Sequence, residues 1–237
     1  MIRIGTAGWS IPKQYAHCFL ADGTQLQRYA SRFSITEINQ TFYKLPCPST
    51  LQKWVDSTPA HFRFCVKLHR SFTHFHKLKS TDGLKEFIDT IEHLGSKLHA
   101  LLVQLPPSLK FDKERAKSFF GFLQSRFHGY LALEARHESW QEAEDLLKKL
   151  QIARVAVDPA RFGSDNRPGG YEDFVYYRLH GSPKIYYSKY SKDFLLELAD
   201  FLLIHPAKEK VVIFDNTASG AAIKNALELT EIVHETQ

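Results

Sequence analysis

The sequence alternates between short apolar, β-branched runs and longer stretches that carry apolar residues at helical spacing. We predict eight strands, at Arg3–Ala7, Phe33–Asn39, Phe62–Leu68, Ala100–Gln104, Tyr130–Arg136, Ala153–Val157, Phe174–His180 and Val211–Asp215. The predicted helices are Thr24–Arg32, Thr50–Ser57, Gly83–Lys97, Lys113–Phe127, Ser139–Leu150, Lys192–Ile204 and Ser219–Val233. Strands that alternate with helices form parallel sheets with right-handed crossovers. We therefore expect residues 1–237 to form a single domain, a (β/α)8 TIM-type barrel.

Two features refine this expectation. Residues 159–173, between the sixth and seventh strands, are rich in Pro, Gly, Asp and Asn, so a long loop is expected there in place of a helix. An open doubly wound sheet is the alternative fold, and it would need a phosphate-binding loop after the first strand. Gly5 and Gly8 suit such a loop, but Trp9 and Pro12 follow where its helix should begin.

Helix N-caps are predicted at two positions, Ser49 and Asp112. Each precedes a helical stretch, and each carries a side-chain oxygen that can accept a hydrogen bond from a free backbone N–H of the first turn.

Composition places the chain among ordinary globular proteins, with 43% hydrophobic and 24% charged residues. No apolar run reaches the ~18 residues of a membrane helix, and the start of the chain does not resemble a targeting segment. The three cysteines lie far apart without a Cys-x-x-Cys pair, which argues against a disulfide framework or a zinc knuckle. We therefore expect a cytoplasmic protein.

The formal net charge of +5 gives a slight preference for anionic partners. No run of five or more Lys and Arg residues occurs, so the charge alone does not identify a nucleic-acid-binding protein. The oligomeric state is left open.

Polar side chains gather at the C-terminal ends of the predicted strands. Residues two apart share a face of a strand, which pairs Glu37 with Asn39, Cys65 with Lys67, Glu134 with Arg136, and Arg178 with His180, while other strands end at Gln104, Asp158, Asp215 and Asn216. Any one of these groups is more simply explained as a solvated or structural residue. Their convergence at one mouth of a barrel, where active sites of this architecture lie, predicts a functional site.

The first hypothesis is an enzyme that acts on a small anionic, phosphorylated substrate. Lys67, Arg136 and Arg178 would hold the anion. A carboxylate among cations has a lowered pKa, which suits a general base such as Glu37 or Glu134. The full candidate set contains Glu37, Glu134, Asp158 and His180 as catalytic residues, with Asn39, Lys67, Gln104, Arg136, Arg178, Tyr187 and Asn216 as substrate-binding residues.

Two alternatives remain open. The same acids and His180 could bind a divalent metal in a phosphodiesterase, an endonuclease-like enzyme or an isomerase, although the interspersed cations would repel the ion. No cofactor is required by the sequence. The other alternative is a non-catalytic nucleic-acid or phospho-ligand binder. It rests on the tyrosines and lysines after the seventh strand, namely Tyr186, Tyr187, Tyr190, Lys184, Lys189 and Lys192.

The chain also resembles the YecE-like family, known as domain of unknown function 72. The resemblance rests on Gly5 with Gly8-Trp9, on 37–43 (Glu-Ile-Asn-Gln-Thr-Phe-Tyr), on 64–67 with Thr73-His74, on 104–108, on 133–137 with Trp140, on Asp158, on 178–181 with Tyr187 and Tyr190, and on 214–217. It covers essentially the whole chain and implies a TIM-type barrel with a pocket, without an established reaction. Asp215 departs from the family pattern, which often has a second asparagine before Asn216.

Overall fold

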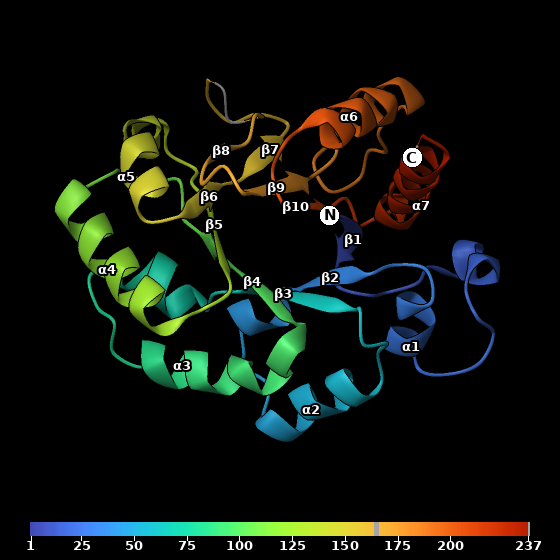
Figure 1. The fold of residues 1–237 in the computed structure, drawn as a ribbon, viewed down its shortest axis with the longest axis horizontal. Helices are drawn as coiled ribbons and strands as arrows, with labels where there is room; N and C mark the ends of the chain where they lie inside the picture. Colours follow the sequence, from blue (N-terminus) through green and yellow to red (C-terminus); the bar gives the residue numbers. More distant parts are fainter. Residues whose placement is uncertain (164–165, 237) are drawn as a thin grey trace.

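A computed structural model describes residues 1–163 and 166–236 as a mixed α/β fold built around one sheet (Figure 1). Its strands are β1 (Ile2–Ala7), β2 (Ile35–Ile38), β3 (Arg63–Lys67), β4 (Leu98–Gln104), β5 (Tyr130–Glu134), β6 (Ile152–Arg154), β7 (Ala156–Asp158), β8 (Gly169–Gly170), β9 (Phe174–Leu179) and β10 (Glu209–Phe214). The strand order is β7-β9-β10-β1-β2-β3-β4-β5-β6-β8. All neighbours pair in parallel except β6 and β8, which are antiparallel.

The sheet is nearly closed into a barrel. The sixth predicted strand is divided: β6 pairs with β5, whereas β7 pairs with β9, and only Val155 separates the two segments. The two ends of the sheet are thereby joined along the chain. The expected loop at 159–173 contains no helix in its described part, but it contains β8, which the sequence did not predict; residues 164–165 lie outside the described residues.

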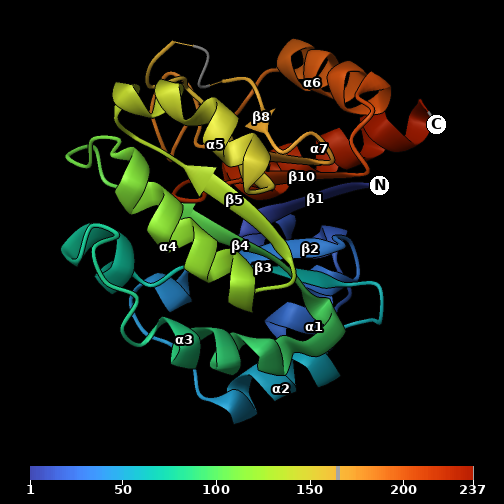
Figure 2. The ribbon, with the colours of Figure 1, turned by 60° about the vertical axis from the view of Figure 1, so that its left-hand side comes forward.

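Helices surround the outer face of the sheet (Figures 1 and 2). They are α1 (Gln25–Ala30), α2 (Pro48–Asp56), α3 (Leu84–Ile91), α4 (Lys113–Arg126), α5 (Glu144–Lys149), α6 (Lys192–Ile204) and α7 (Ala221–Glu235). Each overlaps a predicted helix. Short 3-10 turns add Lys13–Cys18, Gln40–Phe42, Glu92–Lys97 and Glu138–Ala143, and Ser71–Phe75 forms a π turn.

The two predicted N-caps have different outcomes. Asp112 caps α4, because its side chain accepts a hydrogen bond of 3.0 Å from the Arg115 backbone N–H. The prediction for Ser49 is wrong: α2 begins earlier, with Cys47 at the N-cap and Pro48 at the first helical position. Proline is favoured there because its fixed φ suits a helix start and its missing N–H would have no helical partner.

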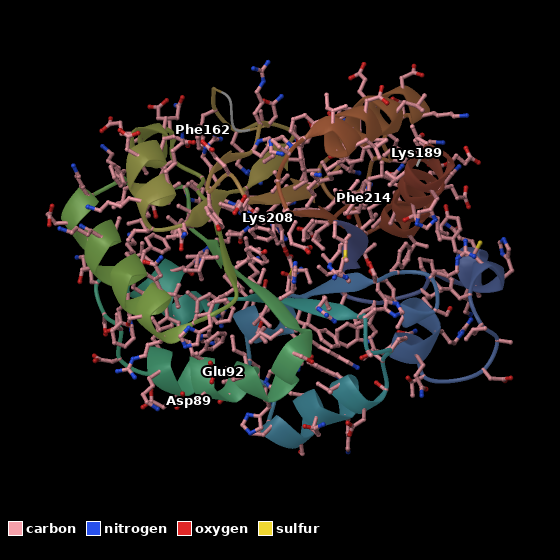
Figure 3. The ribbon with its side chains drawn as sticks, viewed as in Figure 1. Asp89, Glu92, Phe162, Lys189, Lys208 and Phe214 are labelled. Atoms are coloured by element: carbon pink, nitrogen blue, oxygen red, sulfur yellow. The ribbon has the colours of Figure 1, made fainter. Side chains whose placement is uncertain are left out.

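The core has two layers that follow the alternation of side chains along the strands. Ile35, Cys65, Ala100, Leu102, Ala132, Ala153, Val155, Val157, Phe174, Tyr176, Val211 and Ile213 form the inner cluster, inside the barrel. A larger cluster, which includes Phe64, Val66 and Leu68, also contains the buried residues of the helices. Exposed charges such as Asp89 and Glu92 lie on the outer side of the helical layer (Figure 3). Among the described residues, no helix has the length and apolar character to cross a membrane.

Candidate functional site

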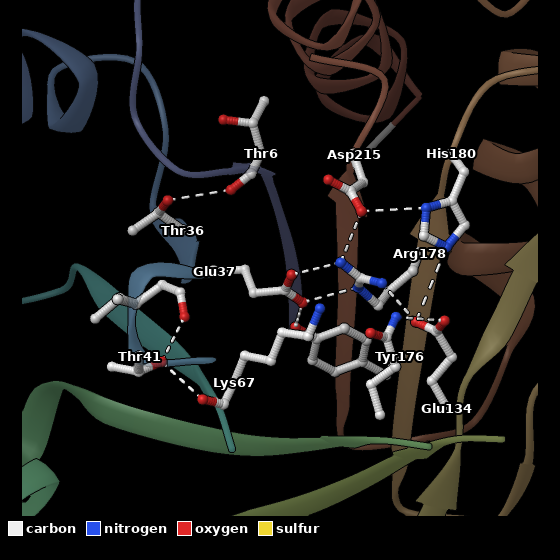
Figure 4. Close-up of polar contacts among 12 residues, drawn as sticks. Thr6, Thr36, Glu37, Thr41, Lys67, Glu134, Tyr176, Arg178, His180 and Asp215 are labelled. Carbon is white, nitrogen blue, oxygen red and sulfur yellow. Dashed lines mark hydrogen bonds and ion pairs between the residues drawn. The ribbon is translucent and has the colours of Figure 1, made fainter. Parts of the chain in front are cut away.

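Arg178, on β9, lies at the centre of a buried ionic cluster at the C-terminal ends of the strands (Figure 4). Its Nε and Nη2 donate to the two Glu37 carboxylate oxygens at 3.0 and 2.8 Å, a bidentate pair. Nη1 donates to Glu134 Oε2 at 2.5 Å, and Nη2 also donates to Asp215 Oδ2 at 2.8 Å. One guanidinium therefore donates hydrogen bonds to three carboxylates, which come from β2, β5 and the residue after β10.

The ionisation of this cluster is set by mutual pairing. Burial alone would raise the pKa of Glu134, but the positive charges of Arg178 and Arg136 hold that pKa well below its usual value. Burial also works against ionised Asp215, and Arg178 again keeps its pKa lowered. The carboxylates in turn raise the pKa of Arg178 well above its usual value, against the effect of burial. These three groups are therefore charged at neutral pH.

A second set of side chains holds the carboxylates in place. Tyr176 donates to Glu37 Oε2 at 2.8 Å, Gln104 Nε2 to Glu134 Oε1 at 2.7 Å, and Arg136 Nε to Glu134 Oε1 at 2.9 Å. The His180 ring lies between two acids, with Nδ1 3.1 Å from Asp215 Oδ2 and Nε2 3.9 Å from Glu134 Oε2. The cluster is thus rigidly connected across the barrel.

A cavity of about 360 Å³ lies at this end of the barrel, within the size range of ligand pockets. Its lining is Phe42, Tyr43, Lys67, Arg70, His74, Phe75, Gln104, Arg136, Tyr186 and Asp215. The lining contains three Lys or Arg side chains, four Phe or Tyr rings and one carboxylate. Such a surface suits a ligand with an anionic group and a flat apolar part.

Lys67 and Arg136 occupy contrasting environments in this cavity. The Lys67 ammonium lies 4.4 Å from the centroid of the Phe42 ring and, among the described residues, makes no hydrogen bond or ion pair. Burial, followed by the nearby Arg178, lowers the pKa of Lys67 to about 8. Arg136 is anchored through Nε on Glu134, and its terminal nitrogens have no hydrogen-bond partner in the described part of the chain.

Most of the predicted site residues come together. Lys67, Gln104 and Arg136 line the cavity, while Glu37, Glu134, Arg178 and His180 form the buried cluster, all four of them fully buried. The buried position of Arg178 differs from the expectation that this residue holds a ligand anion directly. All three of its nitrogens donate to protein carboxylates, and the fully buried residue does not line the cavity. A same-face pattern cannot distinguish a cation that lines a pocket from one that is saturated below it.

Four predicted residues, Asn39, Asp158, Tyr187 and Asn216, lie outside both the cavity lining and the buried cluster. Asn39 precedes the turn Gln40–Phe42, and Asp158 ends β7, where its carbonyl accepts from the backbone N–H of His180 at 2.8 Å. Tyr187 is half exposed, and Lys184 covers its ring at 4.2 Å.

Asn216 has a structural place in the fold. Its Nδ2 donates to the Ser188 carbonyl at 2.9 Å and to Asn225 Oδ1 at 3.1 Å, which ties the loop after β9 to α7. Its side chain is fully buried and does not line the cavity.

Several lining residues were absent from the predicted set, namely Phe42, Tyr43, Arg70, His74, Phe75, Tyr186 and Asp215. Most follow a strand end within a few residues, on the turns Gln40–Phe42 and Ser71–Phe75 or beside them. Aromatic and basic residues immediately after β2 and β3 are the signal that would have identified them.

Two of the three acids expected as metal ligands, Glu37 and Glu134, do meet, together with Asp215, but around the Arg178 guanidinium, whereas Asp158 lies outside this cluster at the end of β7. In the described part of the chain, no group of three or more His, Cys, Asp and Glu residues is placed to hold a metal ion. The guanidinium occupies the position at which those oxygens converge.

Known proteins resemble this chain in sequence, and solved structures resemble it in fold. The UPF0759 protein YunF of Bacillus subtilis (strain 168) is 26% identical over 98% of this chain and 95% of that protein. The UPF0759 protein YecE of Escherichia coli (strain K12) is 32% identical over 67% of this chain, and the match spans 59% of that relative's own length.

A crystal structure of a DUF72 family protein from Thermotoga maritima MSB8 superimposes with a TM-score of 0.78 and 26% identity, over 99% of both chains. The model of the family described as protein of unknown function DUF72 matches residues 3–237. These matches confirm the resemblance drawn from the sequence motifs, and the chain belongs to the DUF72 family.

Proposed function

We propose that this protein is an enzyme that binds a small anionic, phosphorylated substrate in the cavity at the mouth of its barrel. The observation that carries the proposal is the position of Arg136. Its Nε is fixed on a buried carboxylate, and its terminal nitrogens have no partner among the described residues of this cationic cavity. A guanidinium oriented in this way suits a bidentate contact with a phosphate group.

The other lining residues support the same substrate class. Lys67 and Arg70 add positive charge, and Arg70 lies 5.3 Å from the centroids of both the Tyr43 and Phe75 rings. The aromatic side chains offer a surface for a flat part of the substrate. Glu37 and Glu134 then act by fixing Arg178 and Arg136, because both carboxylates are fully buried below the cavity.

We also propose that the barrel-like sheet is a (β/α)8 barrel in which β6 and β7 together form the sixth strand. A cytoplasmic location is part of the same proposal, supported by the free cysteines Cys18, Cys47 and Cys65.

A thermal-shift screen tests the function. Sugar phosphates, nucleotides, divalent metals and short nucleic acids are each added to the wild-type protein, to Arg136→Met and to Arg126→Met. Arg126 is an exposed arginine on α4 and provides the matched control. A ligand at about a hundred times its dissociation constant adds roughly 2.7 kcal/mol of stability, which raises Tm by several degrees.

We expect a phosphorylated compound to raise the Tm of the wild type and of Arg126→Met but not of Arg136→Met. A shift that survives in Arg136→Met would remove Arg136 from the proposed site. Stabilisation by divalent metals alone would favour the metal-dependent alternative.

Nucleic-acid binding is the second candidate function. Exposed aromatic rings at and near the mouth, on Tyr43, Phe75, Tyr186 and Tyr187, are interleaved with basic residues. Rings and cations in this arrangement can stack bases and contact phosphates. Nucleic-acid binding predicts an affinity for a short single-stranded nucleic acid that falls steeply as the salt concentration rises. The same affinity should be lower in Phe75→Ala.

A further inference from the structure

Lys67 is a buried basic residue of the cavity that makes no ion pair with a carboxylate among the described residues. It ends β3, its side chain reaches toward the buried cluster in Figure 4, and only 9% of the residue is exposed. The nearby carboxylates of Glu37, Glu134 and Asp215 form their ion pairs with Arg178. Among the described residues, the Lys67 amine makes no hydrogen bond or ion pair, and it lies over the face of the Phe42 ring.

This environment raises the fraction of neutral Lys67 amine above that of an exposed lysine. Lysine becomes a nucleophile when it is desolvated or placed beside another cation, and both conditions hold here: burial is the larger cause and Arg178 the second, and the pKa of Lys67 falls to about 8. About a tenth of Lys67 is then uncharged at pH 7, far more than of an exposed lysine.

We propose that Lys67 is a nucleophile that forms a Schiff base with an aldehyde or ketone group of the substrate. This inference rests on the proposed function, because Arg136 and Arg70 would hold the anionic group of the same molecule. It narrows the substrate class to phosphorylated carbonyl compounds.

The step balances without a cofactor. The lone pair of the neutral Lys67 nitrogen attacks the carbonyl carbon, and the carbonyl electrons move to the oxygen, which takes a proton. The carbinolamine then takes up a second proton from solvent as the nitrogen loses one, and it releases water to give a protonated C=N bond. The net change is amine plus carbonyl plus one proton to iminium plus water.

The carboxylates near Lys67 would offset part of the cost of the charge on the product. An iminium carries a positive charge at the position of the Lys67 nitrogen. Glu37, Glu134 and Asp215 act on the Lys67 nitrogen in the opposite direction to burial and Arg178, because their charges favour its cationic form. The buried acids are therefore a fixed counter-charge for a cation that forms during the reaction.

Trapping with two phosphorylated aldehydes of different size tests the inference. Glyceraldehyde 3-phosphate or pyridoxal 5′-phosphate is incubated with the folded full chain, sodium borohydride reduces any imine, and peptide mass mapping locates the adduct. Pyridoxine 5′-phosphate, which has no aldehyde, reports binding of the anion alone by calorimetry. Lys67→Arg keeps the positive charge but cannot form the imine, and Lys117→Arg is the control at an exposed lysine on α4.

We expect at least one aldehyde to label Lys67 preferentially, at near one equivalent per chain, in the wild type and in Lys117→Arg but not in Lys67→Arg. The labelling rate should rise about tenfold per pH unit below pH 8 and level off above it, because only the neutral amine reacts. The charged groups that set this midpoint are Arg178, Glu37, Glu134 and Asp215.

Two results would overturn the inference: labelling spread over exposed lysines, or no adduct with either aldehyde. If pyridoxine 5′-phosphate still binds the wild type and Lys67→Arg, the proposed anion site stands and only the Schiff base fails. If it does not bind and no adduct forms, the proposed function fails as well.

Discussion

At the scale of single residues, the side chain with the greatest effect on the site is Arg178. It is fully buried and pairs with Glu37, Glu134 and Asp215. Removing one partner of a buried ion pair leaves uncompensated charge and costs about 3–5 kcal/mol. Arg178→Met should therefore lower the free energy of unfolding at pH 7 by at least that amount, as measured by urea denaturation, whereas Arg126→Met should change it little.

The loss should depend on pH in a defined direction. In the wild type, Glu134 has a pKa below its unfolded value, so its contribution to stability is present above the unfolded pKa of about 4.3 and lost as pH falls through the folded pKa. Without Arg178 the buried carboxyls gain stability on protonation instead. The gap between wild type and Arg178→Met should narrow toward pH 4; a constant gap would contradict the pairing.

Replacing Lys67 should stabilise the protein, whereas replacing Arg178 should destabilise it. Its folded pKa of about 8 lies below the ordinary value of 10.5, so the charged form disfavours folding at neutral pH and the penalty disappears above about pH 10.5. Lys67→Met should raise the free energy of unfolding at pH 7 by roughly 1–3 kcal/mol. Urea denaturation at pH 7 and pH 10.5 checks this, and an equal gain at both pH values would exclude charge burial as its cause.

The sequence predicted much of the site at this scale. The alternation of side chains along strands correctly brought Glu37, Glu134, Arg178 and His180 to the inside of one end of the barrel. It could not predict that Arg178 would be saturated, because that depends on distances between four strands. It also omitted Arg70 and Phe75, which lie on turns where no periodicity applies.

At the scale of elements, the close approach of β1 and β2 is the feature most sensitive to a single substitution. A Cβ at Gly5 would lie 2.0 Å from the Ile35 carbonyl oxygen, a backbone atom that cannot move aside freely. The Tyr29 hydroxyl, which donates to that same oxygen at 3.1 Å, fixes α1 over this pairing. β1 and β2 in turn position Glu37.

Gly5→Ala should strongly destabilise the protein, and Gly121→Ala is its matched control. Gly121 lies within α4 with open space around its would-be Cβ, so alanine there should stabilise by up to about 1 kcal/mol. Thermal denaturation of the two variants checks the pair. A Tm for Gly5→Ala within a degree or two of the wild type would contradict the tight strand pairing.

Helices and strands were largely predictable because apolar periodicity is a local property. Lys192–Ile204 was predicted with the bounds that α6 shows, and its N-cap Ser191 accepts from Phe194 N at 3.3 Å. The division between β6 and β7 was not predictable. It arises because the strand pairs with β5 at its start and with β9 at its end, which is a non-local property.

At the scale of the whole molecule, the fold concentrates charge at one end of a nearly closed barrel. Carboxylates from β2 and β5 and the residue after β10 meet a guanidinium from β9, and the cavity above them is lined by further cations. The buried cluster is rigid and internally paired, which leaves Arg136, Lys67 and Arg70 for a ligand. The arrangement predicts that the cavity selects ligands that carry an anionic group.

A calorimetric comparison of pyridoxine 5′-phosphate with pyridoxine tests this claim most directly, because the two compounds differ only in the phosphate. Hydrogen bonds to charged groups contribute about 1.5–3 kcal/mol each, so we predict at least tenfold tighter binding of the phosphorylated compound, weakened by salt and lost in Arg136→Met. Equal affinity of the two compounds, or a phosphate preference that Arg136→Met leaves unchanged, would contradict an anion site at the mouth of the barrel.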